Sequence, residues 1–163
     1  MGKTWILIMT GLFFIGCATT SPQKSQLEIR EFQTRSYETK DTKMVMKAVL
    51  NTLQDEGFMV KNAVPDLGLL TATKEIEVED KTQAFLATLL GGSNATWLKN
   101  SIIEATANIS DFGSQTKVRV NFLVKTYDNK GGVREVKQID DGNYYQNFFS
   151  KVDKGIFIQK EKL

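Results

Sequence analysis

The chain has 163 residues, of which 41% are hydrophobic and 25% are charged. This composition is near the globular average and excludes a disordered, collagen-like or multi-pass membrane protein. The 21 Lys and Arg residues nearly balance the 19 Asp and Glu residues, and the formal net charge of +2 argues against nucleic acid as a partner. Histidine is absent and Cys17 is the single cysteine, which excludes histidine catalysis, an internal disulfide and a Cys/His zinc site.

The N-terminus has the order of a secretory signal peptide. A basic start precedes an uncharged, largely apolar run over residues 4–16, which is shorter than the roughly 20 residues of a membrane-spanning helix. Residues 14–17, Phe-Ile-Gly-Cys, resemble the bacterial lipobox, in which Leu usually stands where this chain has Phe14. The resemblance implies cleavage before Cys17 and acylation of its sulfur, and each buried methylene of an acyl chain contributes about 0.8 kcal/mol to membrane binding. The alternative is a secreted protein cut near Ala18 without acylation.

Ala18 follows the predicted lipidated cysteine. Lipoproteins retained in the inner membrane of Gram-negative bacteria often carry Asp there, so the resemblance implies the outer membrane, facing the periplasm. Residues 18–26 are polar and aperiodic, which is typical of a tether. The predicted organisation is a lipoprotein signal peptide over residues 1–16, the lipidated cysteine and tether over 17–26, and one periplasmic domain over 27–163.

The first half of the predicted domain begins with residues 27–39, whose alternation predicts a half-buried strand. A helical period then runs from Asp41, the expected N-cap, to Gly57, the expected C-terminal stop. The predicted inner face of this helix carries Val45, Ala48, Val49, Thr52 and Leu53. Two strands, at 58–64 and 68–74, follow across a turn.

The second half contains three further predicted strands, at 101–110, 117–124 and 133–139, and a final helix with an aromatic face. The residues expected to face inward are Ile103, Ala105, Ala107 and Ile109, then Val118, Val120, Phe122 and Val124, then Tyr145, Phe148, Phe149, Val152 and Ile156. The pattern predicts an α+β fold: an antiparallel sheet of about five to six strands with two main helices packed on one face. The expected order is β-α-β-β-(α)-β-β-β-α.

The helix in brackets belongs to an insert, residues 82–98, that contains no charged residue, whereas the preceding residues 75–81 contain five. Phe85, Leu89 and Leu90 fall on one helical stripe, and a Gly-rich break separates them from Trp97. One interpretation is that this stripe packs on its own domain. The other is that these four residues form an exposed contact with another subunit, a partner or the membrane surface.

Carboxylates cluster at 55–56, 75–80 and 140–141, but their spacing favours solvated faces, turns and helix caps. No calcium loop, phosphate-binding loop or nucleophile elbow occurs in the sequence, so we predict no catalytic residue, metal site or cofactor. Gln33 and Arg35 are expected on one face of the first strand. There they form either a polar pair that binds a partner strand or ligand, or a plain solvated face.

Five segments resemble a family of small bacterial envelope lipoproteins. They are residues 32–39 (FQTRSYET), 53–58 (LQDEGF), 67–74 (LGLLTATK), 145–151 (YQNFFSK) and 156–158 (IFI). Together they cover most of the predicted domain. The family has no established chemistry, so the resemblance implies a lipid-anchored periplasmic domain and assigns no catalytic residue.

The sequence favours a non-enzymatic structural or accessory subunit of a cell-envelope assembly, such as a transporter, secretion or motility complex. It would be held at the membrane by Cys17 and would bind an envelope protein or a second copy of itself. The first alternative is a lipid or small-ligand binding module with residues 82–98 as a lid. The second is a hydrolase that uses serine and lysine or a carboxylate pair, for which the sequence contains no specific motif.

Overall fold

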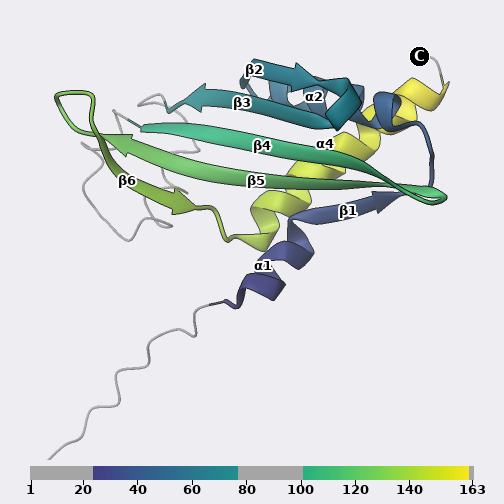
Figure 1. Cartoon of the computed structure of the whole chain (residues 1–163), viewed down its shortest axis with the longest axis horizontal. Helices are drawn as coiled ribbons and strands as arrows, with labels where there is room; N and C mark the ends of the chain where they lie inside the picture. Colours follow the sequence, from purple (N-terminus) through teal and green to yellow (C-terminus); the bar gives the residue numbers. More distant parts are fainter. Residues whose placement is uncertain (1–23, 77–100, 162–163) are drawn as a thin grey trace, which may run out of the picture.

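The computed structural model describes residues 24–76 and 101–161, and in it the predicted α+β class is confirmed (Figure 1). The elements are α1 (Gln26–Phe32), β1 (Thr34–Tyr37), α2 (Thr42–Asp55), β2 (Met59–Val64), the 3-10 turn η1 (Pro65–Leu67), β3 (Leu69–Glu75), β4 (Ser101–Phe112), β5 (Gln115–Tyr127), β6 (Val133–Gln138) and α4 (Gly142–Glu161). Within these two ranges, no helix is both long and apolar enough to cross a membrane.

The six strands form one antiparallel sheet in the order β1-β5-β4-β3-β2, and β6 pairs with β5 as well. The strand β1 pairs with the first part of β5, and β6 pairs with its last part. These two short strands therefore lie end to end along the same edge of β5 (Figure 1). Between them, Val120 N–H donates to the Gln33 carbonyl at 2.9 Å, and Ile139 N–H donates to the Phe122 carbonyl at 2.9 Å.

Helices α2 and α4 cover one face of the sheet (Figure 1). Every inward-facing residue predicted for β4, β5 and α4 is buried, which confirms the periodicity argument. Phe122 lies at the centre of the core, with ring centroids 5.8 Å from Phe58, 5.0 Å from Tyr144, 5.5 Å from Tyr145 and 5.2 Å from Phe148. Aromatic packing therefore helps to join the sheet to α4.

Helix α2 begins and ends where the sequence predicts. The Asp41 carboxylate accepts the Met44 N–H at 2.8 Å and caps the first turn. Gly57, just after the helix, has φ +82°, a left-handed conformation that side chains other than glycine disfavour. All five residues of the predicted inner face are buried.

The prediction of a strand over residues 27–39 is wrong for its first half, because residues 26–32 form helix α1. A capping box starts this helix: Ser25 Oγ accepts the Glu28 N–H at 3.2 Å, and Ser25 N–H donates to Glu28 Oε2 at 2.6 Å. A strand would place Ile29 and Phe32 on opposite faces, but in the helix they are three positions apart and turn toward the domain on one face. Gln26, expected at the end of the tether, is the first residue of α1.

Candidate functional site

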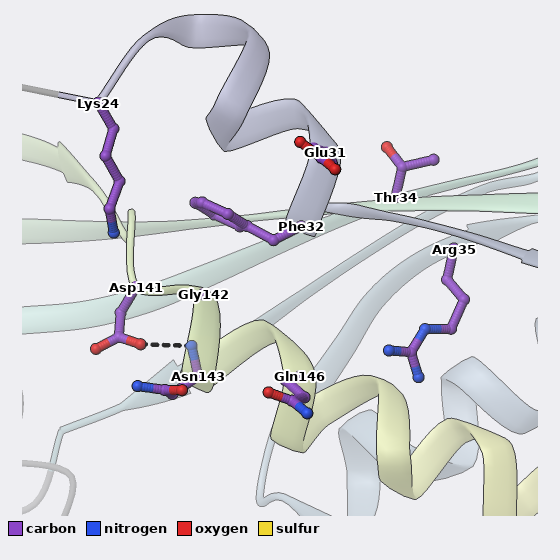
Figure 2. A pocket seen from close by; sticks show the side chains of 9 residues that line it. All are labelled: Lys24, Glu31, Phe32, Thr34, Arg35, Asp141, Gly142, Asn143 and Gln146. Carbon is purple, nitrogen blue, oxygen red and sulfur yellow. Dashed lines mark hydrogen bonds between the residues drawn. The ribbon is translucent and has the colours of Figure 1, made fainter.

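A pocket of about 520 Å³ lies where α1 and the start of α4 meet β1 (Figure 2). We call it the α1–α4 groove. Its lining residues are Lys24, Glu31, Phe32, Thr34, Arg35, Asp141, Gly142, Asn143 and Gln146. They come from the two ends of the domain sequence, which the end-to-end arrangement of β1 and β6 along β5 brings together.

A buried polar cluster fixes the elements around the groove. Gln33 is 1% exposed, and its Nε2 donates to Asn121 Oδ1 at 3.2 Å and to the Tyr145 hydroxyl at 3.1 Å. The same hydroxyl accepts the Phe122 N–H at 3.2 Å. Burial raises the pKa of Tyr145, while the hydrogen bonds from Phe122 and Gln33 oppose that shift. One hydroxyl therefore connects the end of α1, the middle of β5 and the first turn of α4.

Gln33 and Arg35 both point to the side of the sheet that α4 covers, but only Arg35 lies in the strand. Gln33 precedes β1 as the C-cap of α1, and its side chain turns into the buried cluster. Arg35 lies in β1, where its Nη1 donates to Asp153 Oδ2 at 2.8 Å and its guanidinium lies 5.1 Å from the centroid of the Phe149 ring. Of the two residues, only Arg35 lines the groove.

Two of the charged groove residues serve the fold directly. Asp141 Oδ1 accepts the N–H groups of Asn143 at 2.7 Å and Tyr144 at 3.1 Å, which confirms the predicted cap at the start of α4. The Arg35–Asp153 pair links β1 to α4, but its side chains are 36% and 48% exposed. An ion pair with that much exposure contributes at most about 1 kcal/mol.

Other groove residues have side-chain hydrogen-bonding groups without a partner among the described residues. The side chains of Glu31, Asn143 and Gln146 are exposed and make no hydrogen bond or ion pair with another described residue. Figure 2 shows them on α1 and on the first turns of α4, around the same hollow. They provide a carboxylate and two amides within reach of one ligand.

Most side chains that line the groove are polar or charged. Thr34, the hydroxyl-bearing residue among its lining, donates its hydroxyl to the Arg30 carbonyl at 2.8 Å. Over residues 24–76 and 101–161, no group of three or more acidic or cysteine side chains is placed to hold a metal ion. The arrangement fits the capture of a polar segment or side chain.

No protein-family model matches this chain, and no curated protein sequence is significantly similar to it. The predicted lipidation site Cys17 lies outside the described residues. So do the predicted contact residues Phe85, Leu89, Leu90 and Trp97. The α1 side of the groove is not predicted, because the alternation over residues 27–39 favours a strand in place of α1. The S-x-x-E capping signal at Ser25 and Glu28 is the feature of the sequence that indicates the helix.

We expect Tyr145→Phe to lower the free energy of unfolding by about 2 kcal/mol, because the buried Phe122 N–H would lose its acceptor. Tyr37→Phe is the matched control. The Tyr37 hydroxyl is buried and has no hydrogen-bond partner in the described structure, and burial followed by the Asp153 charge raises its pKa. Its removal should change stability by no more than about 0.5 kcal/mol or increase it. Equal losses in urea denaturation of the two variants would refute the proposed role of the Tyr145 hydroxyl.

Proposed function

We propose that this chain is a lipid-anchored lipoprotein of the bacterial cell envelope, located at the periplasmic face of the outer membrane. It serves as a non-enzymatic accessory subunit of an envelope assembly, and it contacts its protein partner through the α1–α4 groove. The observation that carries the proposal is the set of uncommitted polar side chains, Glu31, Asn143 and Gln146, around one hollow.

The position of the groove in the chain supports this proposal. Lys24 lines the groove and follows Cys17 closely in the sequence. The stretch between these two residues spans at most about 25 Å when fully extended. If Cys17 carries the lipid, the groove is held near the membrane surface, within reach of the periplasmic parts of membrane proteins.

The edges of the sheet favour recognition through side chains over strand addition. In β2, Lys61 is skipped in the pairing with β3, and in β6, Arg134 is skipped in the pairing with β5. A bulge that carries a basic residue disrupts the regular row of backbone groups that an added strand would need. A partner is therefore better accommodated in the groove than along these edges.

Replacing Cys17 by Ser tests the anchor. We expect the variant to lose signal cleavage before residue 17 and to gain no acyl chains, because serine lacks the thiol that is acylated. Fractionation of the source bacterium, together with intact-mass measurement of the purified chain, reads out both effects. Normal processing and full retention of the serine variant in the outer-membrane fraction would contradict the lipoprotein assignment.

Site-specific photo-crosslinking tests the groove. A photoreactive residue at Gln146, inside the groove, should give one discrete adduct with an envelope protein in living cells. The same residue at Gln54, an exposed glutamine of α2 outside the groove, is the matched control. Glu31→Lys should reduce the Gln146 adduct, because it reverses the charge of an uncommitted groove side chain. Identical adducts from both positions would contradict the groove assignment, and an adduct of two copies of this chain would assign self-association.

A further inference from the structure

A lysine already occupies one end of the α1–α4 groove. Lys24 Nζ donates to the Asp140 carbonyl at 2.5 Å and lies 5.4 Å from the centroid of the Phe32 ring. In Figure 2 the Lys24 side chain runs from the start of α1 to the start of α4, alongside the ring. The lysine thus makes one hydrogen bond and one cation–π contact that bridge two helices.

The surroundings of this ammonium group are suited to a cation in general. A hollow of about 430 Å³ lies beside it, lined by Lys24, Glu28, Glu31, Phe32 and Gly142. The ring face, the Asp140 carbonyl and the two glutamates all favour positive charge. The Ser25 backbone and side-chain hydrogen bonds lower the pKa of Glu28, which favours the ionised carboxylate that any exposed glutamate has at neutral pH. We call the position beside the Phe32 ring and the Asp140 carbonyl the cation seat. A guanidinium group also fits this position, because it stacks flat on an aromatic ring and pairs with carboxylates.

We propose that this seat is a cation subsite of the groove, which receives an arginine or lysine side chain of the partner and which Lys24 fills in the free chain. The proposal rests on the proposed function of the groove and specifies the chemistry of the partner. The neighbouring Glu31 carboxylate, which has no partner among the described residues, is placed to pair with the incoming side chain.

Displacement of Lys24 links partner binding to the N-terminal segment. Lys24 precedes α1, so its departure from the Asp140 carbonyl breaks the direct hydrogen bond between that segment and the start of α4. Competition between Lys24 and the partner's side chain also lowers the apparent affinity of the chain for that side chain. If Lys24 fills the seat about nine-tenths of the time, only about one-tenth of the molecules can accept a second cation, and the apparent affinity falls about tenfold.

The test uses Nα-acetyl-arginine methylamide as the probe and the uncharged citrulline analogue as its control. Binding to the chain purified from its source in detergent micelles is followed by NMR shifts of the Gly142 amide and of the Gln146 side chain. We expect Lys24→Met to bind the arginine probe about tenfold more tightly than the wild type. Lys24→Arg, which keeps a cation at this position, and Lys40→Met, an exposed lysine elsewhere, should both match the wild type. The citrulline probe should shift neither signal.

A second variant locates the seat. Adding Phe32→Leu to Lys24→Met should remove at least the tenfold gain, since leucine fills similar space without a π face. Unchanged shifts of the Val45 and Ile103 signals, from fully buried residues of α2 and β4, would show that the fold persists. The inference is overturned if Lys24→Met binds no better than the wild type, or if the citrulline probe binds as well as the arginine probe.

The outcomes separate this inference from the function on which it rests. Tight probe binding by Lys24→Met without a partner adduct at Gln146 would retain the cation subsite and reject the groove as the partner site. A partner adduct that is indifferent to Lys24→Met, with no gain in probe binding, would retain the function and reject the subsite.

Discussion

Phe122→Ala is expected to lower the free energy of unfolding by about 4 kcal/mol, since truncating a buried phenylalanine typically costs 3–5 kcal/mol. Phe122 is fully buried on the covered face of β5, and four aromatic rings surround it. Three of those rings belong to α4 and the fourth, Phe58, lies just before β2, so the cavity would open between the sheet and the helix that covers it. Each lost aromatic pair adds to the transfer and cavity costs.

Urea denaturation of the purified chain checks this value. With a slope of about 2 kcal/mol per molar urea, the midpoint should fall by about 2 M. Phe157→Ala is the matched control, because the same atoms are removed from a side chain that is 61% exposed. Its midpoint should move by less than about 0.3 M. If the two variants lost equal stability, Phe122 would not hold the sheet to α4.

The parts of the fold that could be predicted are those where burial follows a simple period. In β4 up to Ile109 and throughout β5 every second side chain is buried, and in α4 the buried aromatic residues lie three or four positions apart. Such patterns show which face of an element is buried, even when the elements that pack against it are not known. The caps at Asp41 and Asp141 were predictable for the same reason, because each side chain bonds backbone groups two or three residues away.

The groove could not be predicted because contacts between distant residues create it. Gln33 looks like an ordinary exposed polar residue in the sequence, yet it bonds Asn121 and Tyr145. Helix α1 has only seven residues, too few for periodicity to separate it from a strand. The place of Lys24 on the Phe32 ring likewise depends on where α4 begins.

Gly68→Ala is expected to cost about 3 kcal/mol or more, for two reasons that act together. Gly68 has φ +62° at the end of η1, a conformation that disfavours a β carbon by about 1–2 kcal/mol. A β carbon at this position would also lie 1.8 Å from the carbonyl oxygen of Ile109. That oxygen belongs to β4, and the Ile109 N–H donates to the Gly68 carbonyl at 2.7 Å. Relief of the clash therefore requires β3 and β4 to separate at this point.

Gly113→Ala isolates the first reason, the left-handed backbone conformation. Gly113 also has a left-handed φ, +72°, in the turn between β4 and β5, but a β carbon there would meet nothing within 4 Å. This variant should lose only the conformational part, about 1–2 kcal/mol. The difference between the two midpoints in urea then measures the close approach of β3 to β4. Equal losses would mean that the backbone at Ile109 yields freely, and that Gly68 is needed for its dihedral angles alone.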